Sequence, residues 1–140
     1  RARRMNFSAL TLASPAIIMH LLFAILAFGL GAIQLVSTKG TRAHRLLGYI
    51  WVVAMIIICV TSFSIKEVMP TGMFGGFSPI HLLSIFALVQ LARGIYFAKI
   101  RDIKRHRQCM QYTYIGGLVI AGAFTFMPGR LLFKVMIEPW

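Results

Sequence analysis

The sequence predicts an all-α membrane protein, a bundle of four transmembrane helices in an up-down-up-down arrangement. Of its 140 residues, 59% are hydrophobic, and the mean hydropathy is +0.80. Only 13% are charged, and these residues gather between long uncharged runs instead of spreading over a surface. The chain has four such runs, each close to the roughly 20 residues that cross a bilayer core.

The first two helices are expected over residues 15–36 and 46–65. Pro15 suits the first turn of a helix, and Gly40 lies in the polar stretch that follows the first run. Lys66 and a glycine-rich stretch close the second run. At about 1.5 Å per residue each helix spans the roughly 30 Å of hydrocarbon.

The third and fourth helices are expected over residues 79–98 and 109–127. Pro128 and Gly129 end the fourth. Residues 131–137 are too few to cross, so we expect an interfacial segment there or part of a longer element. We therefore interpret residues 1–140 as a single four-helix domain.

Short connections predict that consecutive helices pack as antiparallel neighbours. Small residues supply the close contacts that membrane helices need. They form a stripe on the first helix, at Ala24, Ala27 and Gly31, and on the fourth, at Gly117 and Ala121. These stripes are the expected faces of helix contact.

Most aromatic side chains, Trp51 and Tyr114 among them, fall near the expected ends of the spans. Aromatic rings with a polar atom are frequent at the membrane–water interface. We therefore expect an interfacial belt here.

Basic residues predict the orientation. Loops 37–45 and 99–108 carry eight Lys and Arg, against six on the other side. The positive-inside rule places both loops in the cytoplasm of a bacterial inner (plasma) membrane. The basic residues that give the net charge of +12 flank apolar runs. This placement favours anionic lipid headgroups as partners and argues against nucleic acid.

Four histidines fall at two levels of the expected bundle, one for each helix. His20 and His81 lie near the non-cytoplasmic ends of the first and third helices. His44 and His106 precede the second and fourth helices, on the cytoplasmic side. Each pair thus comes from alternate helices.

Paired histidines on facing helices are the ligands that hold haem b in membrane bundles. The sequence therefore predicts one or two haem b groups, with His20, His81, His44 and His106 as iron ligands. The small residues that follow His20 on its own face leave room for a flat cofactor. The propionates of the cytoplasmic haem would be bound by nearby arginines, namely Arg42, Arg45, Arg105 and Arg107.

A histidine at the end of a membrane helix is also a common headgroup contact or cap, so each one alone has a plain structural explanation. Other chemistry is disfavoured. The three acids, Glu67, Asp102 and Glu138, lie outside the spans, unlike the buried carboxylates of proton-coupled carriers. Pairs at separate levels lack the clustered ligands of a zinc site, and no catalytic residue set is predicted.

Three motifs carry a family resemblance: KGTRAHRLLG at residues 39–48, SPIHLLS at 78–84 and DIKRHRQCM at 102–110. With them the chain resembles domain-of-unknown-function family 2306, predicted bacterial membrane proteins, from about residue 20 to 130. A weaker likeness of arrangement is to the two-haem b-561 cytochromes. It implies haem between helices one and three and between two and four, with the second and fourth helices starting about one turn earlier than expected.

Two functions follow as hypotheses. The first is a membrane b-type cytochrome for transmembrane electron transfer, with one or two haems. The second is a cofactor-free structural or accessory subunit of a larger membrane complex, whose basic loops meet anionic lipid or an acidic protein surface.

Overall fold

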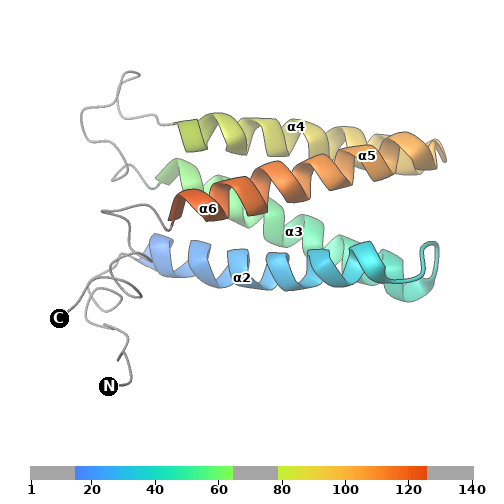
Figure 1. Ribbon diagram of the computed structural model, residues 1–140, viewed down its shortest axis with the longest axis horizontal. Helices are drawn as coiled ribbons and strands as arrows, with labels where there is room; N and C mark the ends of the chain where they lie inside the picture. Colours follow the sequence, from blue (N-terminus) through green and yellow to red (C-terminus); the bar gives the residue numbers. More distant parts are fainter. Residues whose placement is uncertain (1–14, 65–78, 126–140) are drawn as a thin grey trace.

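The computed structural model describes residues 15–64 and 79–125, and its regular elements there are all helical (Figure 1). They are α2 (Pro15–Val36), α3 (Arg42–Ser64), α4 (Pro79–Lys99), α5 (Ile103–Tyr114), the π-helical η1 (Ile115–Ile120) and α6 (Ala121–Thr125). The last three follow one another without a break. The predicted helical class is confirmed for this part of the chain.

Three of the helices are long and apolar enough to cross a membrane. These segments are Pro15–Val36, Arg42–Phe63 and His81–Lys99, with mean hydropathies of 2.4, 2.4 and 1.4. The fourth helix, α5, has only 12 residues and opens with a basic run. The described helices therefore fit a multi-pass membrane protein with three candidate spans.

Helix α2 has the predicted bounds, whereas α3 begins at Arg42, about one turn before the expected start at residue 46. The Thr41 hydroxyl caps this start, because its Oγ1 accepts a hydrogen bond from the backbone N–H of His44 at 3.1 Å. Hydropathy places the basic residues 42–45 in a loop, but with the Thr41 cap the helix begins before them and includes them.

Helix α5 likewise begins at Ile103, well before the expected start at residue 109. Asp102 is its N-cap, and its Oδ1 accepts from the backbone N–H of Arg105 at 3.2 Å. His106 consequently lies within the first turns of a helix, and so does His44 on α3. The interfacial segment predicted at 131–137, and the ends expected at residues 65 and 127, lie outside the described residues.

Helices α2 and α4 occupy opposite sides of the bundle in Figure 1, with α3 behind and the α5–η1–α6 run in front. The main contacts join α2 to α3, α3 to α4, and α4 to α5, and η1 touches both α2 and α4. Alternate helices therefore face one another diagonally.

Aromatic side chains close the middle of the bundle. Trp51 and Tyr114 are only 6% and 8% exposed, so their assignment to an interfacial belt is wrong. Trp51 Nε1 donates to the Ala27 carbonyl and the Tyr114 hydroxyl donates to the Phe28 carbonyl, each at 3.0 Å. Both polar atoms thus find acceptors on the backbone of α2, which lets the rings lie inside.

The predicted small-residue faces do form helix contacts. A Cβ added at Gly31 would meet the Tyr114 ring and lie 2.9 Å from Trp51 Nε1. A Cβ at Gly117 would lie 3.1 Å from the terminal methyl of Met55, which is fully buried. The face after His20 is therefore filled by aromatic rings, and it does not leave the open space that the sequence suggested.

Candidate functional site

Uncharged polar side chains gather at one end of the bundle, where α2 and α4 begin and α3 and α6 end (Figure 1). We call this the serine end. Its polar residues are His20, Thr61, Ser62, His81 and Ser84. No Lys, Arg, Asp or Glu of the described ranges lies there. The other end, where α2 and α4 finish and α3 and α5 begin, is the basic end.

At the serine end His20 is bonded across the helix interface to α3. Its Nδ1 lies 2.9 Å from Oγ1 of Thr61. That hydroxyl gives its own hydrogen to the carbonyl of Ile57 or Ile58, at 2.7 and 3.0 Å. With its hydrogen on either carbonyl, Thr61 accepts from His20, and in this arrangement the ring hydrogen of neutral His20 is on Nδ1 and Nε2 has the lone pair.

His81 lies on α4 at the same end and is 2% exposed. Its ring centroid is 5.7 Å from that of Phe63, on the last turn of α3. One turn deeper, the hydroxyls of Ser62 and Ser84 join α3 to α4 at 2.6 Å. The Ser62 hydroxyl also bonds within its own helix, to the carbonyl of Cys59 at 2.7 Å.

A cavity of about 30 Å³ lies between the helices at this end. Its lining comes from α2, α3, α4, η1 and α6, and includes His20, Ser62, Ser84, Ala87 and Gly117. Room of this size holds one or two water molecules. A cofactor as large as haem requires several hundred Å³, as ligand pockets do in general.

At the basic end His106 is held by the neighbouring helix. Its Nδ1 lies 2.8 Å from the carbonyl oxygen of Gly94 on α4. A carbonyl can only accept, so Nδ1 carries the hydrogen and Nε2 of the neutral ring has the lone pair. The His106 ring therefore has the same tautomer as His20.

His44 lies at the same end, in the first turn of α3. Its backbone carbonyl accepts from Gln34 Nε2 at 2.8 Å. Within the described ranges, His44 Nδ1 and Gln34 Oε1 are buried and lack a hydrogen-bond partner. Such atoms are the usual places for a water or a ligand group.

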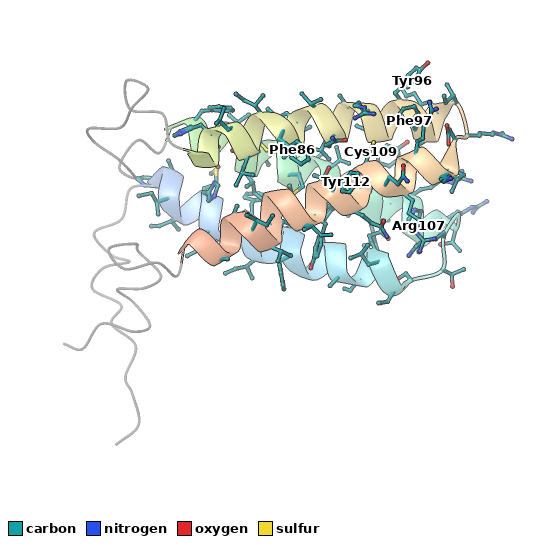
Figure 2. All side chains as sticks on the ribbon, turned by 45° about the horizontal axis from the view of Figure 1, so that its top comes forward. Phe86, Tyr96, Phe97, Arg107, Cys109 and Tyr112 are labelled. Carbon is teal, nitrogen blue, oxygen red and sulfur yellow. The ribbon has the colours of Figure 1, made fainter. Side chains whose placement is uncertain are left out.

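The arginines predicted to bind propionates, Arg42, Arg45, Arg105 and Arg107, are all exposed at the basic end. Arg105 Nε lies 3.5 Å from Asp102 Oδ2, and its guanidinium lies 5.5 Å from the centre of the Phe97 ring. Figure 2 shows Phe97 on α4 above α5, and Arg107 below it toward the start of α3. The predicted arginines thus spread around the basic end.

The structure therefore places the histidines in the predicted pairs by level: His20 with His81 at the serine end, His44 with His106 at the basic end. The donor chemistry fits haem b, which takes two imidazole nitrogens from facing helices. The space at the serine end does not, since the cavity described there holds only about 30 Å³. Within the described residues no group of three or more metal-binding side chains converges.

Sequence reasoning missed the polar residues near the histidines. Thr61 bonds to His20, Gln34 bonds to the backbone carbonyl of His44, and Ser62 and Ser84 bond to each other. A signal was present, because hydroxyls and amides are scarce within apolar runs and pack inward when they occur there. Ser84 stands one turn after His81, on the same face of α4. That spacing alone marks the face that turns inward.

A family model described as "Predicted membrane protein (DUF2306)" matches residues 17–137 of the chain. No curated protein and no solved structure matches it. The resemblance seen in the three motifs is confirmed, while the likeness to two-haem b-561 cytochromes stays a prediction.

Proposed function

The chain belongs to the DUF2306 family of predicted membrane proteins, and from this premise we propose that it is a b-type cytochrome for electron transfer across the membrane. His20 and His81 would hold one haem b at the serine end, and His44 and His106 a second at the basic end. Bound haem would supply the one-electron chemistry. The residues of the chain would hold the iron, orient its ligands and exclude water.

One observation supports this proposal most directly. His20 and His106 both have Nδ1 anchored by an acceptor, Thr61 Oγ1 and the Gly94 carbonyl, at 2.9 and 2.8 Å. Metal-binding histidines usually donate their second ring hydrogen in this way, which fixes the ring and leaves Nε2 for the metal. One ligand of each proposed pair is therefore already oriented.

The proposal requires the bundle to open. Met55 is fully buried beside the serine-end cavity, and its terminal methyl closes against Gly117. A thioether side chain is flexible and can leave such a position. Helices α2 and α4 make few direct contacts, so they can separate without breaking the α2–α3 and α4–α5 pairs.

We also propose that α5, η1 and α6 act together as a fourth span. They run without a break from Ile103 to Thr125, and 23 residues at about 1.5 Å each suffice to cross the hydrocarbon core. The bundle would then be up-down-up-down, with the basic end in the cytoplasm of a bacterial inner membrane. That placement rests on the positive-inside rule and on the exposed Lys and Arg of that end.

The closed packing favours a second candidate, a cofactor-free accessory subunit of a larger membrane complex. The cavity of about 30 Å³ is sufficient for water and needs no cofactor to fill it. The basic end would then meet an acidic partner surface. This subunit would be colourless and would co-purify with its partner.

The deciding experiment is the visible spectrum of the protein purified in mild detergent, oxidised and then reduced with dithionite. Haem per chain is counted by the pyridine haemochrome method. Sharp b-type bands with about two haems per chain are expected, and about one would restrict the function to a single site. A colourless protein that does not take up added haem would refute the cytochrome and favour the accessory subunit.

A further inference from the structure

Two arginines from different helices meet at one aromatic ring at the basic end. The guanidinium carbons of Arg93 on α4 and Arg105 on α5 lie 5.8 and 5.5 Å from the centre of the Phe97 ring. Phe97 is 8% exposed, whereas both arginines are exposed. The ring therefore gathers two cations on the outer surface of the α4–α5 pair.

Arg93 lies unusually deep for a charged residue. It stands six residues before Lys99, the end of the apolar segment His81–Lys99, which places it roughly 9 Å below that end. A charge at such depth is costly unless it reaches the interface and an opposite charge. An opposite charge close to Arg93 would lower this cost.

The described part of the chain does not supply one. Its single acidic residue is Asp102, which pairs with Arg105 Nε at 3.5 Å. That contact leaves the two terminal nitrogens of Arg105 for another acceptor. Nine exposed Lys and Arg surround the same end, so the local field attracts an anion from outside the chain.

We infer that Arg93 and Arg105, held by Phe97, form a binding site for the phosphate headgroup of an anionic phospholipid. A guanidinium that lies over a ring keeps its N–H edge free, and that edge matches the spacing of phosphate oxygens. Tyr96, whose ring centroid is 5.5 Å from that of Phe97, and Ile100 are exposed, and in a membrane such apolar side chains would meet lipid tails. A phospholipid offers a phosphate to the arginines and acyl chains to the apolar side chains, whereas a free anion contacts only the arginines.

The site uses none of the four histidines proposed as iron ligands, although it shares Arg105 with the arginines predicted to bind the haem propionates. It differs also from the general attraction of basic loops for a charged membrane, which every Lys and Arg of this end shares. Arg93 and Arg105 are assigned a specific role, and the other Lys and Arg residues of the basic end are not. Variants that each remove one positive charge can measure this difference in lipid binding.

The experiment compares Arg93→Gln and Arg105→Gln with Arg107→Gln, which removes the same charge from α5 but lies away from Phe97 (Figure 2). The full chain in mild detergent is titrated with phosphatidylglycerol, with phosphatidylcholine as the uncharged control. Binding is read from retained lipid by native mass spectrometry and from the thermal unfolding midpoint.

We expect phosphatidylglycerol affinity to fall about tenfold in the Arg93 and Arg105 variants, and much less in the Arg107 variant. Arg93→Lys should bind with intermediate affinity, because it keeps the charge but loses the paired donors. If all three glutamine variants bind equally, the site does not exist. Displacement of the lipid by millimolar inorganic phosphate would overturn the assignment to a lipid.

Discussion

The two ends of the bundle carry two histidines each but hold them differently. At the serine end the side chains bond to one another across helices, His20 to Thr61 and Ser84 to Ser62. At the basic end, backbone groups take part instead: His106 bonds to the Gly94 carbonyl, and Thr41 caps the N–H of His44. Nine cations surround the basic end, against none described at the serine end.

This difference follows from what each end must satisfy. Polar atoms that face the bundle interior have at most the water of a small cavity to bond, so most must pair with each other or with the backbone. Cations at the basic end keep their hydration or meet headgroups, so their number says little about internal structure. The serine end is consequently the more demanding part of the fold, and changes there should cost more.

The largest effect is expected from removing one histidine at each end. If the protein binds two haems, His20→Ala should remove the serine-end haem and His106→Ala the other, so that each variant retains about one haem per chain. The double variant should have none. Haem content by pyridine haemochrome and the reduced spectrum check this.

Cys109→Ala is the matched control, since Cys109 is buried on α5 but carries no proposed role as a ligand. Its haem content should equal that of the unaltered protein. Loss of both haems from a single histidine variant would show that the two ends are not independent.

The second prediction concerns the middle of the bundle, where Trp51 and Tyr114 pack against Gly31 of α2. Gly31→Ala would place a methyl against the Tyr114 ring and 2.9 Å from Trp51 Nε1, so it should destabilise the bundle by about 2–3 kcal/mol. Gly29, two residues earlier, has nothing within 4 Å of an added Cβ. Gly29→Ala should be neutral or slightly stabilising.

Denaturation in mixed detergent micelles, followed by helical circular dichroism, compares the two glycine variants. Equal stability in both variants would mean that Trp51 and Tyr114 do not pack tightly against Gly31 of α2. A loss confined to Gly31→Ala would show that α2, α3 and α5 are fixed together between the ends.

A third change tests the anchor of His20. Thr61→Val keeps the shape of the side chain but removes the acceptor of the Nδ1 hydrogen, so it should cost about 1–2 kcal/mol of stability. If haem binds there, its affinity at the serine end should fall about 10- to 100-fold.

Thr113→Val is the control for Thr61→Val, because Thr113 is fully buried and its hydroxyl bonds only within α5, to the Cys109 carbonyl at 2.7 Å. Neutral His20 should shift its ring hydrogen toward Nε2 in Thr61→Val alone, which nitrogen NMR of labelled histidine detects. An unchanged tautomer would contradict the assigned donor and acceptor.

The sequence predicts the helical class, the level of each histidine pair and the small-residue contact faces, because hydropathy and helical spacing fix them directly. It does not predict the starts of α3 and α5, since the caps Thr41 and Asp102 outweigh the basic residues that follow. The sequence does not predict the inward position of Trp51 and Tyr114 for another reason. Their acceptors, the Ala27 and Phe28 carbonyls, belong to another helix, and only the fold brings them together.

The turn between α4 and α5 also carries no signal in the sequence. Arg101 has a φ of 60°, in the left-handed region where glycine is usual. The N–H of Arg101 donates to the Ala98 carbonyl at 3.2 Å and that of Asp102 to the Phe97 carbonyl at 2.9 Å. This pair of bonds is a Schellman motif, which ends α4 without a glycine.

The smallest expected effect comes from relieving that turn. Arg101→Gly should stabilise the protein by about 0.5–1 kcal/mol, because the left-handed conformation costs a residue with a Cβ about 1–2 kcal/mol and glycine regains part of this. Arg101→Ala removes the charge but keeps the strain, so it should leave stability unchanged. Gly40, with a φ of 79°, provides the reverse test: Gly40→Ala should destabilise by a similar amount. If Arg101→Gly and Arg101→Ala have the same melting temperature, backbone strain does not govern this turn, and the basic end is shaped by its charges instead.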